Sequence, residues 1–408
     1  MNQANTPAAR VAGLPSYFIV FVASMVAIGP FAIDTYLPAM PSMAKALGVD
    51  IVAVNATLST YLLGFAAGQL LGGPISDQIG RRKVGLLGLL VFFFASLAIA
   101  AATNVTQVLL LRVVQAVGGG FATVICMAMV RDAYEPMEAA KRFPVVMLVM
   151  LSAPLFAPAI GSALLSLGWA SIFVFLAIYS LVVAVAFLPV PETATQAPGH
   201  LTWGDILPQY WSVISRRVNG KLVPLRFIFT QGLLFSGTFV FITNSPFIYL
   251  EHYGIAEEWF VLYFGANILM MMLFTSITTR LIHRHSPHRL FRISRSIQLI
   301  AMLTLTIAVV SIEVPLWLFT ALLAMVIGPS GMNNPTVSGL YLFHFDRLSG
   351  SATSLMNVTV FLFGSILGVV SGFLYDGTLK PIVYTMLAGL LAANVVALTI
   401  PPPVPNDD

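Results

Sequence analysis

The chain has 408 residues, of which 58% are hydrophobic and only 9% are charged, with a formal net charge of +4. Soluble domains carry roughly 25% charged residues because their surface faces water. A chain with so few charged residues cannot cover a water-soluble globule of this size with polar groups. We therefore expect most of its outer surface to face lipid.

Apolar runs of about 20 residues, long enough to cross a bilayer as helices, recur along nearly the whole chain. The first run continues past Asp34 and many others follow, so we expect a retained span and not a cleaved signal peptide. The fold class predicted is therefore an all-α polytopic membrane protein with twelve transmembrane helices. The spans are predicted at 15–40, 51–75, 84–102, 107–130, 144–167, 172–190, 223–250, 259–281, 291–310, 315–342, 351–375 and 382–400.

The longest polar stretch, 191–222, separates the sixth and seventh spans. We interpret it as a cytoplasmic linker between an N-terminal six-helix bundle, 1–190, and a C-terminal one, 223–408. Small residues at every fourth position, which let helices approach closely in lipid, favour helix seams that slide in a rocking transporter. The alternative explanation of these small residues is that membrane helices are generally rich in glycine and alanine. The stripes are Gly64, Gly68 and Gly72 on the second span and Gly364, Gly368 and Gly372 on the eleventh.

The basic residues predict the orientation of the chain. With a cytoplasmic N-terminus, all 20 Lys and Arg residues lie on the cytoplasmic side except Lys45 and Lys380, which lie outside, and Arg112, which lies within a span. This asymmetry predicts a multi-pass membrane protein with both termini in the cytoplasm. Because the basic loops lack interleaved aromatic residues, we expect no nucleic-acid partner. A monomer is the default expectation.

Two charged residues fall inside the predicted spans, where charges are rare and mark functional sites. Asp34 lies about seven residues before the outer end of span one, and Arg112 about six residues after the outer start of span four. Both are therefore expected roughly 10 Å below the outer surface, facing one another or sharing a polar cavity. Loss of water favours a neutral carboxyl group, and a nearby arginine favours a charged one.

Asp34 is therefore the candidate proton carrier, and Arg112 the candidate modulator of its charge. The alternatives are that Asp34 only ends its helix and that Arg112 only anchors its span.

Three motifs resemble those of the major facilitator superfamily. The segment from Gly73 to Lys83, GPISDQIGRRK, is similar to the loop G-x-x-x-D-(R/K)-x-G-R-R, with Gln78 in place of a cation. The segments 112–118 and 153–162 resemble the R-x-x-Q-G-x-G motif of span four and the antiporter motif G-x-x-x-G-P-x-x-G-G of span five. Segments around Asp34, Asp132 and Glu192 resemble the Bcr/CflA branch of drug:proton antiporters.

The resemblance implies a major facilitator fold with two pseudo-symmetric six-helix bundles. It implies that Asp34 binds the transported proton and that Arg112 modulates this site. It also implies an antiporter kink in span five, carried by Pro154, Pro158 and Gly161. A cytoplasmic charge relay, which latches the two halves together, is implied at Gly73, Asp77, Gly80, Arg81, Arg82 and Asp132.

The substrate is expected between the bundles near the middle of the membrane. For each candidate contact the alternative is packing, or hydrogen bonding between helices. The candidates are Tyr36, Tyr61, Phe65, Gln115, Met147, Phe239, Asn244, Asn267, Asn357 and Phe361.

The sequence thus predicts a proton-coupled transporter that exports small, drug-like amphipathic compounds by alternating access, driven by the proton gradient without a cofactor. A metabolite exporter or an uptake symporter of the same fold is the alternative. An ATP-driven pump is disfavoured because the chain has no GxxxxGK[ST] loop. An enzyme is disfavoured because no nucleophile and base converge within the spans. A metal site at His283, His285 and His288 is disfavoured by the surrounding arginines.

Overall fold

The computed structural model describes residues 11, 13–194, 203–218, 220–345 and 349–400. Arg10 and Arg347, which the orientation argument used, and part of the predicted linker, 195–202, lie outside these residues. Within them, twelve helices are long and apolar enough to cross a membrane. This confirms the number of spans predicted from hydropathy.

The first six spans are built from eight α-helices and one short helical segment, η1. The first span is broken into three pieces, and the fourth into two. In chain order the elements are α1 (Phe18–Asp34), η1 (Leu37–Ala39), α2 (Met40–Leu47), α3 (Ile51–Ile79), α4 (Arg81–Ala100), α5 (Val105–Val124), α6 (Cys126–Ala133), α7 (Pro136–Leu165) and α8 (Ala170–Phe187).

The predicted linker contains a helix, α9 (Trp203–Ile214), that the sequence reading did not anticipate. Twelve residues are too few to cross a bilayer, so a search for long apolar runs passes over it. The last six spans follow as α10 (Val223–Pro246) with η2 (Phe247–His252), α11 (Glu257–Leu281), α12 (Pro287–Ser311), α13 (Leu316–Ile327) with α14 (Ser330–Leu342), α15 (Ser349–Phe373) and α16 (Lys380–Leu398).

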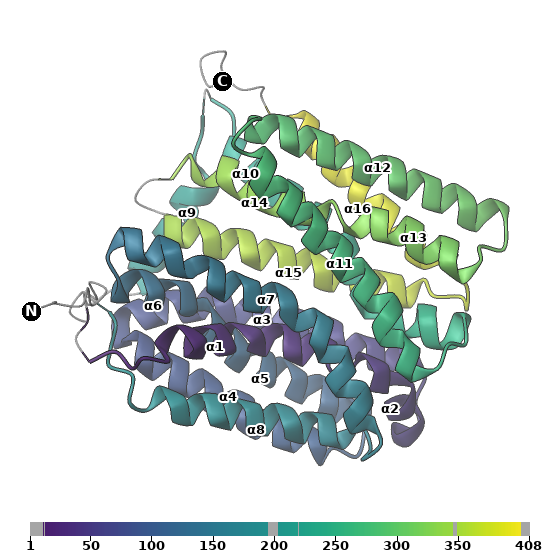
Figure 1. Ribbon diagram of the computed structural model, residues 1–408, viewed down its shortest axis with the longest axis horizontal. Helices are drawn as coiled ribbons and strands as arrows, with labels where there is room; N and C mark the ends of the chain where they lie inside the picture. The colour runs from purple at the N-terminus through teal and green to yellow at the C-terminus, as the bar shows by residue number, and fades with distance from the viewer. Residues whose placement is uncertain (1–10, 12, 195–202, 219, 346–348, 401–408) are drawn as a thin grey trace, which may run out of the picture.

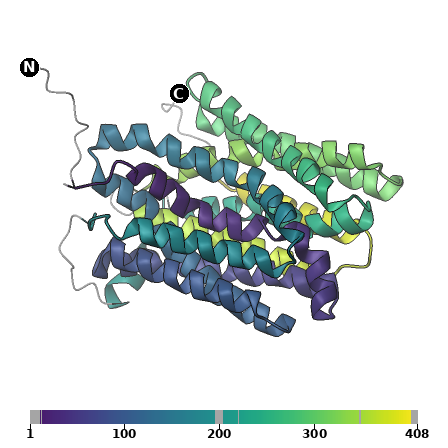
Figure 2. The same ribbon diagram turned by 60° about the horizontal axis from the view of Figure 1, so that its bottom comes forward.

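The helices form two adjacent groups, purple to teal for α1–α8 and green to yellow for α10–α16 (Figures 1 and 2). Most helix contacts lie within one group, and we call the groups the N-half and the C-half. Two main contacts join the halves, α3 with α15 and α7 with α11. We name the two ends of the bundle by residues: the Arg81 end carries the α3–α4 turn, and the Asp50 end carries the α2–α3 turn.

The glycine stripe of the second span lies inside the N-half and not between the halves. A Cβ atom at Gly68 would lie 2.5 Å from the backbone oxygen of Val117 in α5. The stripe of α15 does reach the other half, because a Cβ atom at Gly368 would lie 2.8 Å from the hydroxyl oxygen of Ser59 in α3. The expectation of a sliding seam therefore applies to α15 alone.

The halves touch at both ends of the bundle. At the Asp50 end, the Ser162 hydroxyl of α7 donates a hydrogen bond to the Glu257 carbonyl of α11 (3.3 Å). At the Arg81 end, α9 lies across both halves, because the Tyr210 hydroxyl donates to the Leu70 carbonyl of α3 (3.1 Å) and lies 3.5 Å from the Ser354 hydroxyl of α15.

Replacement of Gly68 by alanine tests the close approach of α3 and α5. The added methyl group meets a carbonyl oxygen that is fixed in its own helix, and overpacking of this kind costs about 1–3 kcal/mol. We expect a lower melting temperature for G68A in detergent, measured by the loss of monodisperse protein after heating.

The matched control is Gly237→Ala in α10, where a Cβ atom meets nothing within 4 Å. Alanine is favoured over glycine in a helix by up to about 1 kcal/mol, so G237A should be at least as stable as the parent. Equal melting temperatures for G68A and the parent would show that the two helices have room to separate.

Candidate functional site

The first span is interrupted directly after Asp34. Pro38 and Pro41 lack the N–H groups that a continuous helix needs, and they disfavour helical conformation in the residues before them. The chain therefore leaves α1 at Asp34, makes a turn, and resumes as η1 and α2. The last carbonyl groups of α1 thereby lose their partners within the helix.

Arg112 of α5 binds at this break. Its side chain is completely buried, and its Nη2 atom donates a hydrogen bond to the Ala32 carbonyl of α1 (3.0 Å). The guanidinium carbon lies 4.4 Å from the ring centroid of Tyr36 and 4.3 Å from that of Tyr61. A desolvated cation between ring faces gains about 2 kcal/mol or more per ring, which partly offsets the cost of burying the charge.

A hydrogen-bonded chain holds Arg112 in place from the other side. Its Nη1 atom donates to Oε1 of Gln115 (2.7 Å), and the Gln115 amide donates to the Ser96 hydroxyl of α4 (2.7 Å). Gln115, a predicted substrate contact, is fully buried and engaged in this chain. In this arrangement it positions the arginine.

Asp34 lies beside this group but takes no part in it. Its side chain is 2% exposed, and its Oδ1 atom is buried without a hydrogen-bond partner. Among the described residues no ion pair joins Asp34 to Arg112, whose Nη atoms donate to Ala32 and Gln115 instead. Both residues are buried, but they do not form a pair. The Tyr61 hydroxyl is also buried and unpartnered.

The C-half carries a neutral counterpart of this network. Asn333 of α14 donates to Oε1 of Gln298 in α12 (2.8 Å), and the Gln298 amide donates to the Ser330 hydroxyl (3.3 Å). Ser330 lies 3.3 Å from the Thr238 hydroxyl of α10. Spans seven, nine and ten are thus joined as spans one, three and four are, but with amides and hydroxyl groups in place of a charge.

Several of the predicted cavity residues form a row of aromatic rings that crosses between the halves. The rings of Tyr61 and Phe65 are stacked with centroids 5.8 Å apart. Phe65 of α3 meets Phe361 of α15 edge to face at 4.9 Å, and Phe361 lies 5.4 Å from Phe239 of α10. The row therefore starts at the ring that covers Arg112 and ends in the C-half.

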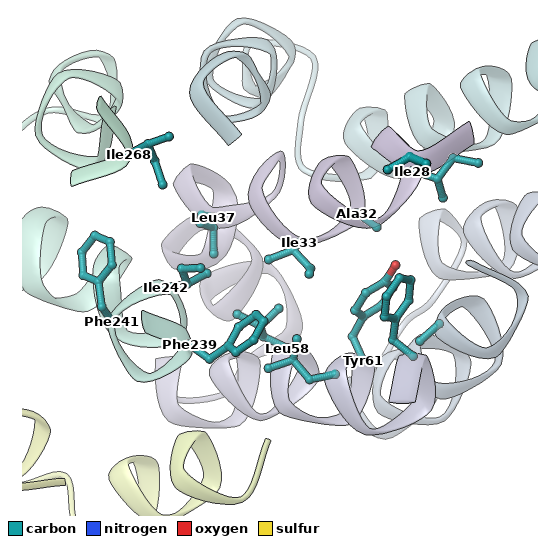
Figure 3. Close-up of a cluster of buried hydrophobic side chains, with 14 of the residues drawn as sticks. Ile28, Ala32, Ile33, Leu37, Leu58, Tyr61, Phe239, Phe241, Ile242 and Ile268 are labelled. Atoms are coloured by element: carbon teal, nitrogen blue, oxygen red, sulfur yellow. The ribbon is translucent and has the colours of Figure 1, made fainter. Parts of the chain in front are cut away.

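Apolar side chains from both halves meet near this row (Figure 3). Ile33 and Leu37, on either side of the break, and Leu58 of α3 lie opposite Phe239 and Ile242 of α10. Ile33, Leu37, Leu58 and Phe239 are at most 6% exposed. These side chains pack the space between the break in span one and α10 with hydrocarbon.

The other predicted cavity residues divide into bonded and free ones. Asn244 donates to the Val240 carbonyl and to the Ser371 hydroxyl of α15, both at 2.8 Å, so it joins two helices of the C-half. Asn267 donates to the Tyr263 carbonyl (2.8 Å) and to the Tyr249 hydroxyl (3.3 Å). Met147 of α7 is 37% exposed and Asn357 of α15 is half-buried, so both remain accessible.

The motif of span five packs against the break in span one. Pro154, Pro158 and Gly161 all lie within the single helix α7. A Cβ atom at position 161 would collide with the Thr35 carbonyl and approach Pro38 to 3.2 Å. Only glycine lets α7 lie this close to the residue that follows Asp34.

A charge relay at the Arg81 end joins three helices of the N-half. Arg81 of α4 forms ion pairs with Asp77 of α3 and, at 3.3 Å, with Asp132 of α6. Gly73 lies within the last part of α3, and Gly80 follows the helix with φ +102°, a conformation that favours glycine. All these bonds lie within one half, so in this arrangement the relay holds α3, α4 and α6 together and does not bridge the halves.

Glu192 is the partner that the sequence reading missed. Its carboxylate accepts hydrogen bonds from the backbone N–H groups of Arg81 (2.9 Å) and Arg82 (3.1 Å), at the first turn of α4. It also accepts from Thr193 and Ala194, both at 3.0 Å. A carboxylate is favoured there because the free N–H groups and the helix dipole both attract negative charge.

The sequence profile of the Major Facilitator Superfamily matches residues 17–369. The chain is 27% identical over 375 residues to a bicyclomycin resistance protein homolog of Haemophilus influenzae, covering 90% of this chain and 92% of that protein. It is 30% identical over 396 residues to a chloramphenicol resistance protein of Pseudomonas aeruginosa, covering 92% of this chain and 90% of that one.

Among solved structures, a D-xylose-proton symporter is similar with a TM-score of 0.75, covering 95% of this chain and 98% of that one. Sequence identity to it is 16%, so the likeness concerns the fold alone. It confirms the predicted architecture of two bundles of membrane helices.

Replacement of Glu192 by glutamine tests its role at the start of α4. Glutamine keeps one acceptor oxygen and loses the charge, so we expect a loss of stability of roughly 1 kcal/mol, as for other helix caps. The measurement is the melting temperature of the purified protein.

The control is Glu138→Gln, which removes an ion pair with the exposed Lys141. Exposed pairs contribute about 0–1 kcal/mol, so E138Q should melt close to the parent. If E192Q and E138Q lowered the melting temperature equally, Glu192 would stabilise the protein no more than an exposed ion pair does.

Proposed function

This chain belongs to the Major Facilitator Superfamily, and we propose that it couples proton entry to the export of small amphipathic compounds across a bacterial inner membrane. Family and fold make it a multi-pass membrane transporter and not an enzyme. The family match also confirms the resemblance inferred from the motifs. Export of drug-like compounds is supported by the two resistance proteins, each aligned over nine-tenths of this chain.

We assign the Arg81 end of the bundle to the cytoplasm. Among the described residues, the helix ends and loops at this end carry almost all the Lys and Arg residues, which supports this orientation by the positive-inside rule. Twelve spans then leave the start of α1 and the end of α16 on the cytoplasmic side. The Asp50 end faces outward, and its loops carry mainly acidic residues.

The observation that carries the proposed mechanism is the unpartnered carboxyl group of Asp34 beside Arg112. The arginine is already bonded to the break in α1, so Asp34 can gain or lose a proton without breaking an ion pair. The free energy of a charged carboxylate differs strongly between a dry and a wet environment. Opening the bundle to one side or the other therefore changes the proton affinity of Asp34.

The contacts between the halves support an arrangement closed to the outside. At the Asp50 end Ser162 and Glu257 join α7 to α11, and the cluster of Figure 3 fills the space next to the break. In the cytoplasmic part of α7, Pro144, Val145, Met147, Leu148 and Met150 are exposed, over more than half of the helix circumference. A helix exposed on so many sides faces both lipid and an opening.

We therefore place substrate entry at the Arg81 end, with Phe65, Phe239 and Phe361 as the apolar wall that an amphipathic compound meets. No cofactor is required, because the proton gradient supplies the driving force. A proton and a substrate that favour different arrangements of the halves each shift the population that serves the other. The relay of Arg81, Asp77 and Asp132 keeps the cytoplasmic end of the N-half rigid as the halves rock.

Substrate-induced proton release from the purified protein tests the role of Asp34. The parent should release protons when substrate binds, and Asp34→Asn should release none, because an amide cannot carry the proton. A pH-sensitive dye in weakly buffered detergent solution measures the release, with chloramphenicol as the first ligand. The control is Asp376→Asn, an exposed acid in the α15–α16 loop, which should release as many protons as the parent.

Proton release by D34N equal to that of the parent would contradict the coupling role. The direction of transport is tested separately in inverted vesicles with an acidic interior. An exporter accumulates the compound inside such vesicles as protons leave, whereas an uptake symporter does not.

A further inference from the structure

The hydroxyl group of Tyr61 is a buried polar group that the mechanism above does not use. Tyr61 of α3 is completely buried, and its hydroxyl oxygen has no hydrogen-bond partner. Buried polar groups are nearly always paired, because an unpaired one loses its bonds to water and gains nothing in return. We therefore expect a state of the protein in which this hydroxyl group is bonded.

The two tyrosines that cover Arg112 differ in their hydroxyl groups. Their rings make equivalent contacts, with the guanidinium carbon 4.4 Å from the centroid of Tyr36 and 4.3 Å from that of Tyr61. The Tyr36 hydroxyl lies 3.3 Å from the Thr57 hydroxyl and so has a partner. The Tyr61 hydroxyl is free, and covering the arginine does not require it.

The packing of α1 against α3 places the Tyr61 hydroxyl beside the end of α1. A Cβ atom at Gly29 of α1 would lie 3.1 Å from the Phe65 ring of α3. The two helices run in opposite directions, so Tyr61, one turn before Phe65, lies level with the residues one turn after Gly29. Those residues are Ala32 and Ile33, and the hydroxyl oxygen of Tyr61 lies on the side of the ring that faces Ala32 (Figure 3).

Asp34 follows directly in the chain and supplies the acceptor. The groups whose charges act on the Tyr61 hydroxyl are Arg112, Tyr36 and Asp34. Arg112 has only donors, and the Tyr36 hydroxyl is already bonded to Thr57. The Oδ1 atom of Asp34 is buried and unpartnered, so it is the free acceptor of this group.

We propose that the Tyr61 hydroxyl donates a hydrogen bond to the ionised carboxylate of Asp34 and thereby sets the pH at which this residue releases its proton. The inference rests on the coupling role proposed above for Asp34. A hydrogen bond to a carboxylate favours its charged form, so Asp34 releases its proton at a lower pH than it would beside a ring without a hydroxyl group. Tyr61 is therefore a positioning residue, which acts through Asp34.

Few other titratable groups are near enough to set this pH. The helices packed against α1 are α5, α6, α7 and α8. The acids and bases of α6 and α7 lie within 126–142, toward the Arg81 end, and Tyr179 of α8 donates to the Ser24 carbonyl, well before Asp34 in α1. In α10, opposite Ile33, the one charged residue is Arg226, near the Arg81 end. The titratable groups that face Asp34 are thus Arg112, Tyr36 and Tyr61.

The test is an infrared titration of the purified full-length protein in detergent, without any substrate. The C=O stretching band that is lost in Asp34→Asn measures the neutral fraction of Asp34 at each pH. Tyr61→Phe keeps the ring on Arg112 and removes only the donor. A hydrogen bond to a charged group corresponds to about one to two pH units, so the midpoint of Y61F should lie that far above the midpoint of the parent.

The matched control is Tyr36→Phe, which removes a hydroxyl group bonded to Thr57 from the other ring on Arg112. Its midpoint should stay close to that of the parent. Y61F removes one oxygen atom that bonds nothing in this structure, so its fold is not at risk.

Two results would overturn the proposal. Equal midpoints in Y61F and the parent would show that the hydroxyl group does not bond the carboxylate. Equal shifts in Y61F and Y36F would show a general effect of packing around Arg112. A carboxyl band that does not titrate even in the parent would contradict the proton-carrier role of Asp34 itself, and this inference with it, so the two failures are distinguishable.

Discussion

The bond between Arg112 and the Ala32 carbonyl is the interaction on which the arrangement of the N-half depends. Two prolines end α1 inside the membrane, where an unpaired carbonyl group has no water to bind. A guanidinium group from α5 supplies the missing donor, and aromatic rings cover its two faces. The break in the helix and the buried charge thus stabilise each other, although each alone is unfavourable.

This arrangement explains why a carboxyl group without a partner is tolerated at position 34. Because Arg112 is fixed by Ala32 and Gln115, its charge stays in place whether Asp34 is ionised or not. Gly161 brings α7 against the next residue, Thr35, so the site is enclosed from a third side. The carboxyl group that we propose as the proton carrier is therefore held among side chains that are bonded to other partners.

The two halves use the same positions for different purposes. The C-half joins spans seven, nine and ten with Asn333, Gln298 and Ser330, which cannot change charge at physiological pH. Between the halves the described contacts are hydrogen bonds of hydroxyl groups, aromatic edges, close-packed glycine and the apolar cluster of Figure 3. Such contacts are individually weak, so the halves can separate at one end without breaking a buried ion pair.

Hydropathy and charge determined the number of spans, their order and the orientation expected for the chain. A membrane helix forms its backbone hydrogen bonds within its own segment, so its sequence need only be long and apolar. The motifs also indicated Asp34, Arg112 and the Arg81 relay. Contacts between residues far apart in the sequence could not be predicted. Nothing in the sequence places Glu192 at the start of α4, or Gly161 against Thr35. The helix α9 could not be predicted from apolar runs either, because its twelve residues are too few to cross a membrane. Sequence thus determined which segments enter the membrane, because that depends on local composition. Tertiary structure alone decided that Arg112 binds Ala32 and Gln115 and that Asp34 has no ion-pair partner, because these contacts depend on how distant helices pack.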